Sequence, residues 1–148
     1  MAGNTQPIFS KIGAMTMGIG ATNALGVASY RTSSYTGTSA TLEPVVFTAE
    51  ASNGSFVQRL RFKSKGTNIA SVARIWINNG TDETVATNNT FYGEVSLPAT
   101  TAATASATVD LDYPMNFALP AGYKIKVGVS AGADLASGWT CMAIAGNY

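Results

Sequence analysis

Few residues in this chain could carry out chemistry, and histidine is not among them. Without an imidazole there is no Ser-His or Cys-His nucleophile pair and no histidine general base. The single cysteine, Cys141, can form neither an internal disulfide nor a multi-thiolate metal site. Its place in an apolar run near the end of the chain is typical of a small buried core residue. Enzymes that depend on histidine or on paired cysteines are therefore excluded.

Two pairs of carboxylates lie close together in the sequence, Asp82 with Glu83 and Asp110 with Asp112. On a strand, Asp110 and Asp112 project from the same face, so they could share a calcium ion or act as the acid and base of a glycan-cleaving enzyme. Neither pair has the repeated Asp/Asn/Gly spacing of a calcium loop, and solvated surface carboxylates are the ordinary alternative. We expect no enzyme activity, no cofactor and no metal site.

A row of cations occupies every second position of one strand-like run; this cationic row consists of Arg59, Arg61, Lys63 and Lys65. A strand places such residues on one face, where we expect Lys124 and Lys126 of a later run to join them. The row could contact phosphate or an acidic protein surface, or it could protect a sheet against edge-to-edge pairing. Because the net charge is only +1 and no aromatic residues lie between these cations, we expect no nucleic-acid binding.

The scaffold that positions these residues is indicated by strand-like runs that recur from residue 42 onward. Turn signals such as Asn79-Gly80 and Ala121-Gly122 separate them. The eight runs are Glu43–Glu50, Phe56–Ser64, Ile69–Asn78, Thr90–Pro98, Ala105–Tyr113, Met115–Pro120, Tyr123–Ser130 and Gly138–Gly146. This pattern predicts an all-β fold, an antiparallel β-sandwich of about eight strands that is jelly-roll-like, and it leaves an immunoglobulin-like arrangement open.

The first part of the chain has a different composition, rich in Gly, Ala, Ser, Thr and Met. We predict an N-terminal arm or early strand with a linker at 1–41, followed by the β-sandwich domain at 42–148. The uncharged segment from Ile12 to Tyr30 is diluted by Gly and polar residues, so we expect no membrane span and no signal peptide. Its apolar residues Met15, Met17 and Ile19 suit an adaptable protein–protein interface.

The overall charge bears on association. Charged residues make up 11% of the chain and the net charge is +1, whereas a typical domain has about 25% charged residues. A protein this close to neutral has to avoid self-association by other means, or it associates as part of its function.

Several short motifs in fixed order give the chain a resemblance to a known group. The segments FVQRLRFKSKGTNIASVARIWINNG, FYGEVSLPATT, LPAGYKIKVGVS and GWTCMAIAGNY contain a GTN turn, an INNG turn, an LPAG turn and a terminal GW…GxY pattern. Over residues 42–148 the chain resembles small virion structural proteins of tailed bacteriophages. Some of these look like capsid cement proteins, which are β-sandwich trimers on the shell.

The resemblance implies a non-enzymatic decoration protein on the capsid exterior of a virion, made in the cytoplasm of a bacterial host. Its expected partners are the major capsid protein and two further copies in a homotrimer. The expected contact residues are Met15, Met17, Ile19 and the cationic row, which could meet an acidic capsid surface. The alternative is a receptor- or glycan-binding module of a head or tail fibre, with aromatic residues stacking on sugar rings: Tyr30, Tyr35, Tyr92 and Tyr113.

Overall fold

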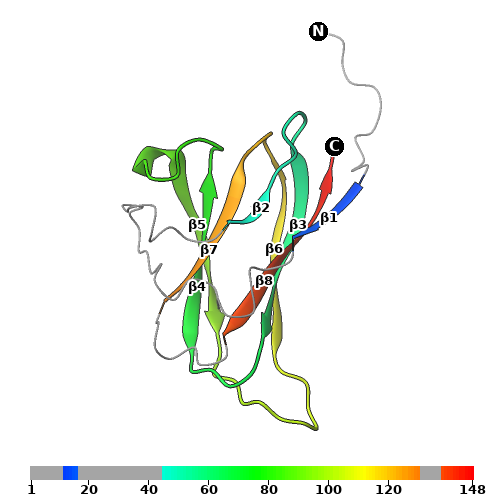
Figure 1. The fold of residues 1–148 in the computed structure, drawn as a ribbon, viewed down its shortest axis with the longest axis vertical. Helices are drawn as coiled ribbons and strands as arrows, with labels where there is room; N and C mark the ends of the chain where they lie inside the picture. Colours follow the sequence, from blue (N-terminus) through cyan, green and yellow to red (C-terminus); the bar gives the residue numbers. More distant parts are fainter. Residues whose placement is uncertain (1–11, 17–44, 131–137) are drawn as a thin grey trace.

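The computed structural model describes residues 12–16, 45–130 and 138–148, and these form a β-sandwich (Figure 1). A single turn of 3₁₀-helix, η2 (Ala86–Asn88), precedes β5, and the described residues contain no α-helix. The strands are β1 (Ile12–Thr16), β2 (Val45–Thr48), β3 (Ser55–Ser64), β4 (Ser71–Asn78), β5 (Asn89–Leu97), β6 (Asp110–Leu119), β7 (Lys124–Ser130) and β8 (Trp139–Asn147).

The strands form two antiparallel four-stranded sheets. Sheet A has the order β1-β8-β3-β6 and sheet B has the order β2-β7-β4-β5. Every connection except β4 to β5 passes from one sheet to the other. This interleaving of eight strands is the topology of a jelly roll. The expected all-β, antiparallel, jelly-roll-like sandwich is therefore confirmed.

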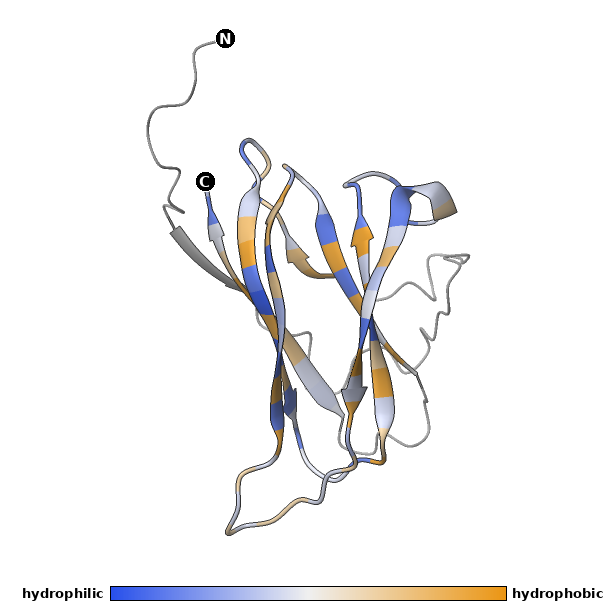
Figure 2. Ribbon diagram, turned by 180° about the vertical axis from the view of Figure 1, so that it is seen from behind, coloured by the Kyte–Doolittle hydropathy of each residue, from blue (hydrophilic) through white to orange (hydrophobic). Residues whose placement is uncertain are grey.

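The core lies between the sheets and follows from period-two alternation (Figure 2). In β3, Leu60 and Phe62 are fully buried while Arg59 and Arg61 point outward. An extra residue in β3, Gln58, shifts the register against β8 and changes the phase, so that Val57 also points inward. Sheet B and β8 complete the core with fully or almost fully buried residues: Ala73, Ile75, Leu97, Ile125, Val127, Val129, Trp139, Cys141 and Ala143.

Strand β6 differs from the expected pattern. The two runs on either side of Pro114 form one strand, Asp110–Leu119, and the residues just before it are not in a strand. Proline is tolerated because β6 is the edge of sheet A and needs no N–H donor on its open side. Asn116, with φ +52°, lies where the register with β3 shifts. The strand count still reaches eight because β1 pairs with β8.

One end of the sandwich is held together by Asn68, which is buried in the β3–β4 loop. Its amide nitrogen lies within 3.2 Å of Ser64 Oγ, Thr100 Oγ1 and the carbonyl oxygens of Gly66 and Gly138. Its Oδ1 accepts the Gly138 backbone N–H at 2.6 Å. Asn68 therefore links the β3–β4 loop, the β5–β6 loop and the start of β8, which explains the GTN motif.

The INNG and LPAG motifs meet at the opposite end of the sandwich. Gly80 has φ +86°, and a Cβ there would lie 2.7 Å from the carbonyl oxygen of Gly122, which itself has φ +73°. Only glycine fits such a position without strain. These motifs are therefore turn determinants that set how the loops pack.

Candidate binding surface

The cationic row lies on the outer face of sheet A, as the alternation predicted. Arg59, Arg61 and Lys63 are half-buried on β3, and Lys65 is exposed one residue beyond the end of that strand. Leu60 and Phe62 are fully buried whereas the cations beside them are not, which confirms that these cations and the core residues of β3 point in opposite directions.

The aspartates of β6 lie directly beside these cations. In the antiparallel register Arg61 is opposite Asp112, and Lys63 is opposite Asp110. Arg61 donates a hydrogen bond to Asp110, and Arg59 Nε lies 3.5 Å from Asp112 Oδ1. The two groups that the sequence suggested separately thus form one ion-pair cluster. Sequence reasoning missed it because the strand register could not be known.

The electrostatics of this cluster disfavour acid catalysis. The hydrogen bond and charge of Arg61 hold the pKa of Asp110 below its usual value, and the same contact raises the pKa of Arg61. A general acid in a glycosidase needs a raised carboxyl pKa. The arrangement therefore suits charge pairing on a surface rather than proton donation.

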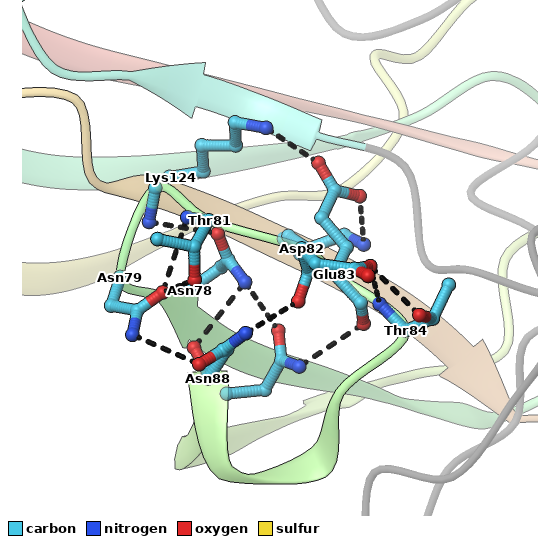
Figure 3. Close-up of polar contacts among 11 residues, drawn as sticks. Asn78, Asn79, Thr81, Asp82, Glu83, Thr84, Asn88 and Lys124 are labelled. Atoms are coloured by element: carbon cyan, nitrogen blue, oxygen red, sulfur yellow. Dashed lines mark hydrogen bonds and ion pairs between the residues drawn. The ribbon is translucent and has the colours of Figure 1, made fainter.

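Lys124 and Lys126 do not join the cationic row, contrary to expectation. Both lie on β7 in sheet B, on the other layer of the sandwich. Glu83 of the β4–β5 loop bridges them, with 2.7 Å from each lysine Nζ to one carboxylate oxygen (Figure 3). Lys126 is 0% exposed, although strand alternation would place it on the solvent face. Burial acts to raise the pKa of Glu83, but the two lysines outweigh it and lower this pKa.

A network of amide side chains holds Glu83 in place (Figure 3). Asn78 donates to the Asn88 carbonyl and to Asn89 Oδ1, and it accepts the Gly80 N–H. Asn88 donates to the carbonyl of Asp82, and Asn89 donates to the carbonyl of Glu83. The clustering of Asn at 78–79 and 88–89 is the sequence signal for this loop, and only its Asn79-Gly80 turn was predicted from the sequence.

The aromatic residues considered for sugar stacking are partly brought together. Tyr92 on β5 and Tyr113 on β6 meet edge to face, with ring centroids 6.3 Å apart, and Phe117 lies 5.4 Å from Tyr92. A Cβ on Gly93 would lie 2.4 Å from the Tyr113 hydroxyl, so this glycine makes room for the tyrosine. Tyr30 and Tyr35 lie outside the described residues.

A shallow hollow of about 290 Å³ adjoins the cationic row on the outer face of sheet A. It is lined by Phe56, Gln58, Ile144, Ala145 and Gly146. Ile144 of β8 is opposite Met15 of β1 in the register, which places this candidate contact residue on the same sheet. The other two, Met17 and Ile19, lie outside the described residues.

Searches of protein-family models, curated proteins and solved structures found no match for this chain. Within the described ranges, no helix is long and apolar enough to cross a membrane. The same part of the chain holds no group of three or more His, Cys, Asp or Glu side chains arranged around a metal ion. Cys141 is buried, and burial raises the pKa of its thiol.

Proposed function

We propose that this chain is a non-enzymatic structural protein of a tailed-phage virion, which decorates the capsid exterior and binds the major capsid protein. The observation that carries the proposal is the outer face of sheet A, where ion-paired charges adjoin a shallow hollow that Phe56 and Ile144 help to line. Arginines and aromatic residues such as the exposed Phe56 are enriched at protein–protein interfaces. The jelly roll agrees with it, since viral capsid domains often have this topology.

In this proposal the protein stabilises the shell by mass action. A subunit that binds the assembled shell, and not its separated proteins, favours the assembled state, and the effect grows with the logarithm of its free concentration once this exceeds the dissociation constant. Its contacts with the shell come from residues 1–41, including Met15, Met17 and Ile19, and from the cationic row. Three copies form a homotrimer. The outer location and the trimer are expectations from the resemblance and have their own test.

The test is a joint measurement of native mass and copy number. We expect the purified protein to have the mass of a trimer, and intact particles to contain it at a fixed, high ratio to the major capsid protein. A monomer that is absent from purified particles would refute the proposal. Reversing the four charges of the cationic row without any loss of particle binding would remove the row from the contact.

A receptor- or glycan-binding module is the second candidate, favoured by the exposed Tyr92 ring over Tyr113 and Phe117. An exposed tyrosine offers an apolar face and a hydroxyl to a sugar. Copy number separates the two functions, since a fibre module is present in far fewer copies than a decoration subunit. Loss of glycan binding in Tyr92→Ala, with Tyr148→Ala unchanged, would support this second function.

A further inference from the structure

Strands β3 and β6 carry opposite charges at matched heights on the outer face of sheet A. The register places Arg61 beside Asp112 and Lys63 beside Asp110. Viewed from outside, the face therefore has a cationic column next to an anionic column. Strand β8, on the far side of β3, adds the partly buried Met142 beside Arg61.

These charged groups are accessible and keep bonding capacity. Among the described residues, the Lys63 ammonium makes one hydrogen bond, 2.6 Å to the carbonyl oxygen of Thr108, and an ammonium has three donors. The Asp112 side chain is 50% exposed, and its ion pair with Arg59 spans 3.5 Å, longer than a normal hydrogen bond. The Asp110 side chain is 42% exposed. A further charged surface can therefore reach them.

A face with two such columns is complementary to itself. A two-fold rotation about an axis parallel to the strands, midway between β3 and β6 and in front of the face, places β3 of one copy over β6 of the other. This rotation preserves height along the strands. The second copy's Lys63 then comes over Asp110 and its Arg61 over Asp112, and the same contacts form in the reverse direction. We propose that the outer face of sheet A binds the same face of a second copy of this chain.

The charge pattern selects this occupant over an acidic partner. The carboxylates of Asp110 and Asp112 would repel an acidic surface beside the very cations that attract it. A second copy avoids this repulsion because each column faces its opposite. The net charge of +1 also leaves little repulsion between whole molecules.

The area of the outer face of sheet A limits how tightly two copies can associate through it. The rotation overlaps only β3 and β6 of each copy, because β6 is the edge of sheet A. Two strands of about ten residues, at roughly 3.3 Å per residue and 4.8 Å between strands, give a footprint of roughly 300 Å². A stable interface usually buries about 800 Å² per partner. We therefore expect a weak contact that depends on salt and becomes significant where copies are held close together. The contact does not depend on a virion role, and a face covered by a second copy cannot bind the capsid protein at the same time, which then leaves residues 1–41 as the proposed contact with the shell.

The test is sedimentation equilibrium of the full chain over a range of protein concentrations at about 0.05 M and 0.5 M NaCl. We expect a concentration-dependent doubling of the mass of whatever unit exists at high salt, with at least tenfold weaker association at the higher salt. The double variant Asp110→Lys with Asp112→Lys, which makes the face cationic throughout, should lose the doubling. Circular dichroism and a melting curve verify that each variant is folded.

A charge-swapped chain provides the matched control. It carries Arg61→Glu, Lys63→Glu, Asp110→Lys and Asp112→Lys, which keeps the net charge and the self-complementarity. The swapped chain should double like the wild type, but fluorescence energy transfer between labelled wild-type and swapped chains should stay below a tenth of the value for random mixing. Random mixing, or a wild-type mass that is independent of concentration at both salt levels, would overturn the proposal.

If the swapped chain does not fold, the milder pair Asp110→Asn with Asp112→Asn should weaken association at least fivefold, and an unchanged association constant would overturn the proposal.

Discussion

The two sheets of this sandwich both carry ion pairs on their outer sides, but in different surroundings. On sheet A, Arg61 and Asp110 are 40% and 42% exposed. On sheet B, Glu83 is 21% exposed and one of its two partners, Lys126, is 0% exposed. The same chemical pairing therefore lies in water on one layer and largely out of water on the other.

The difference teaches that the contribution of a charge pair to stability depends on how far the pair is exposed to water. An exposed pair is screened by water and salt and contributes little to the free energy of unfolding. A buried pair has lost hydration, so removing one member leaves the other in a place where its charge is costly. We expect the Glu83 cluster to hold the β4–β5 loop on sheet B, and the sheet A cluster to serve association.

Among the variants that test this comparison, we expect Glu83→Gln to change the free energy of unfolding most. The substitution removes the carboxylate that Lys124 and the buried Lys126 share, so we expect the free energy of unfolding to fall by about 3 kcal/mol. Urea denaturation measures it. Asp110→Asn on sheet A is the control, since Asp110 and its partner Arg61 are 42% and 40% exposed, and we expect it to cost less than about 1 kcal/mol. Equal losses in both variants would contradict a distinct role for the buried cluster.

We expect a smaller change in the free energy of unfolding when the pH is lowered. The folded-state pKa of Glu83 is lowered from the ordinary value of 4.5, so its stabilising contribution is present above about pH 4.5 and is lost as the pH falls through the lower folded value. The difference in the free energy of unfolding between wild type and Glu83→Gln should therefore be full at pH 7 and narrow below pH 4.5. Denaturation curves at pH 7, 5, 4 and 3 measure this narrowing. A difference that stays constant over this range would mean that Glu83 acts through shape and not through its charge.

Local sequence patterns predicted much of the fold but little of the charge pairing. The alternation in β3 and the turn glycines are encoded by near neighbours. The period of two that places Arg59 and Arg61 on one face places Leu60 and Phe62 on the other, where both are fully buried. Pro114 misled the strand assignment because its tolerance depends on β6 being an edge strand, which is a property of the whole sheet.

The candidate site needed information that no local pattern holds. The Arg61–Asp110 pair joins residues 49 positions apart, and it exists only because β3 and β6 are neighbours in a specific register. Lys126 was expected on a solvent face because period two is all that a strand pattern contains. Its burial, together with its bond to Glu83, depends on how a loop 43 residues away in sequence folds back onto β7.

The smallest expected effect on stability is on sheet A, in Arg61→Gln and Asp110→Asn. Because both side chains are exposed, we expect each variant to melt within about 2 °C of the wild type. Thermal melts at low and high salt measure this, and a large loss at either salt would mean that the pair supports the fold. Self-association should respond differently, since Arg61→Gln removes one charge from the cationic column of each copy and Asp110→Asn removes one from the anionic column. A variant that melts like the wild type but associates more weakly would separate the two roles, and would show that the exposed pair matters between molecules rather than within one.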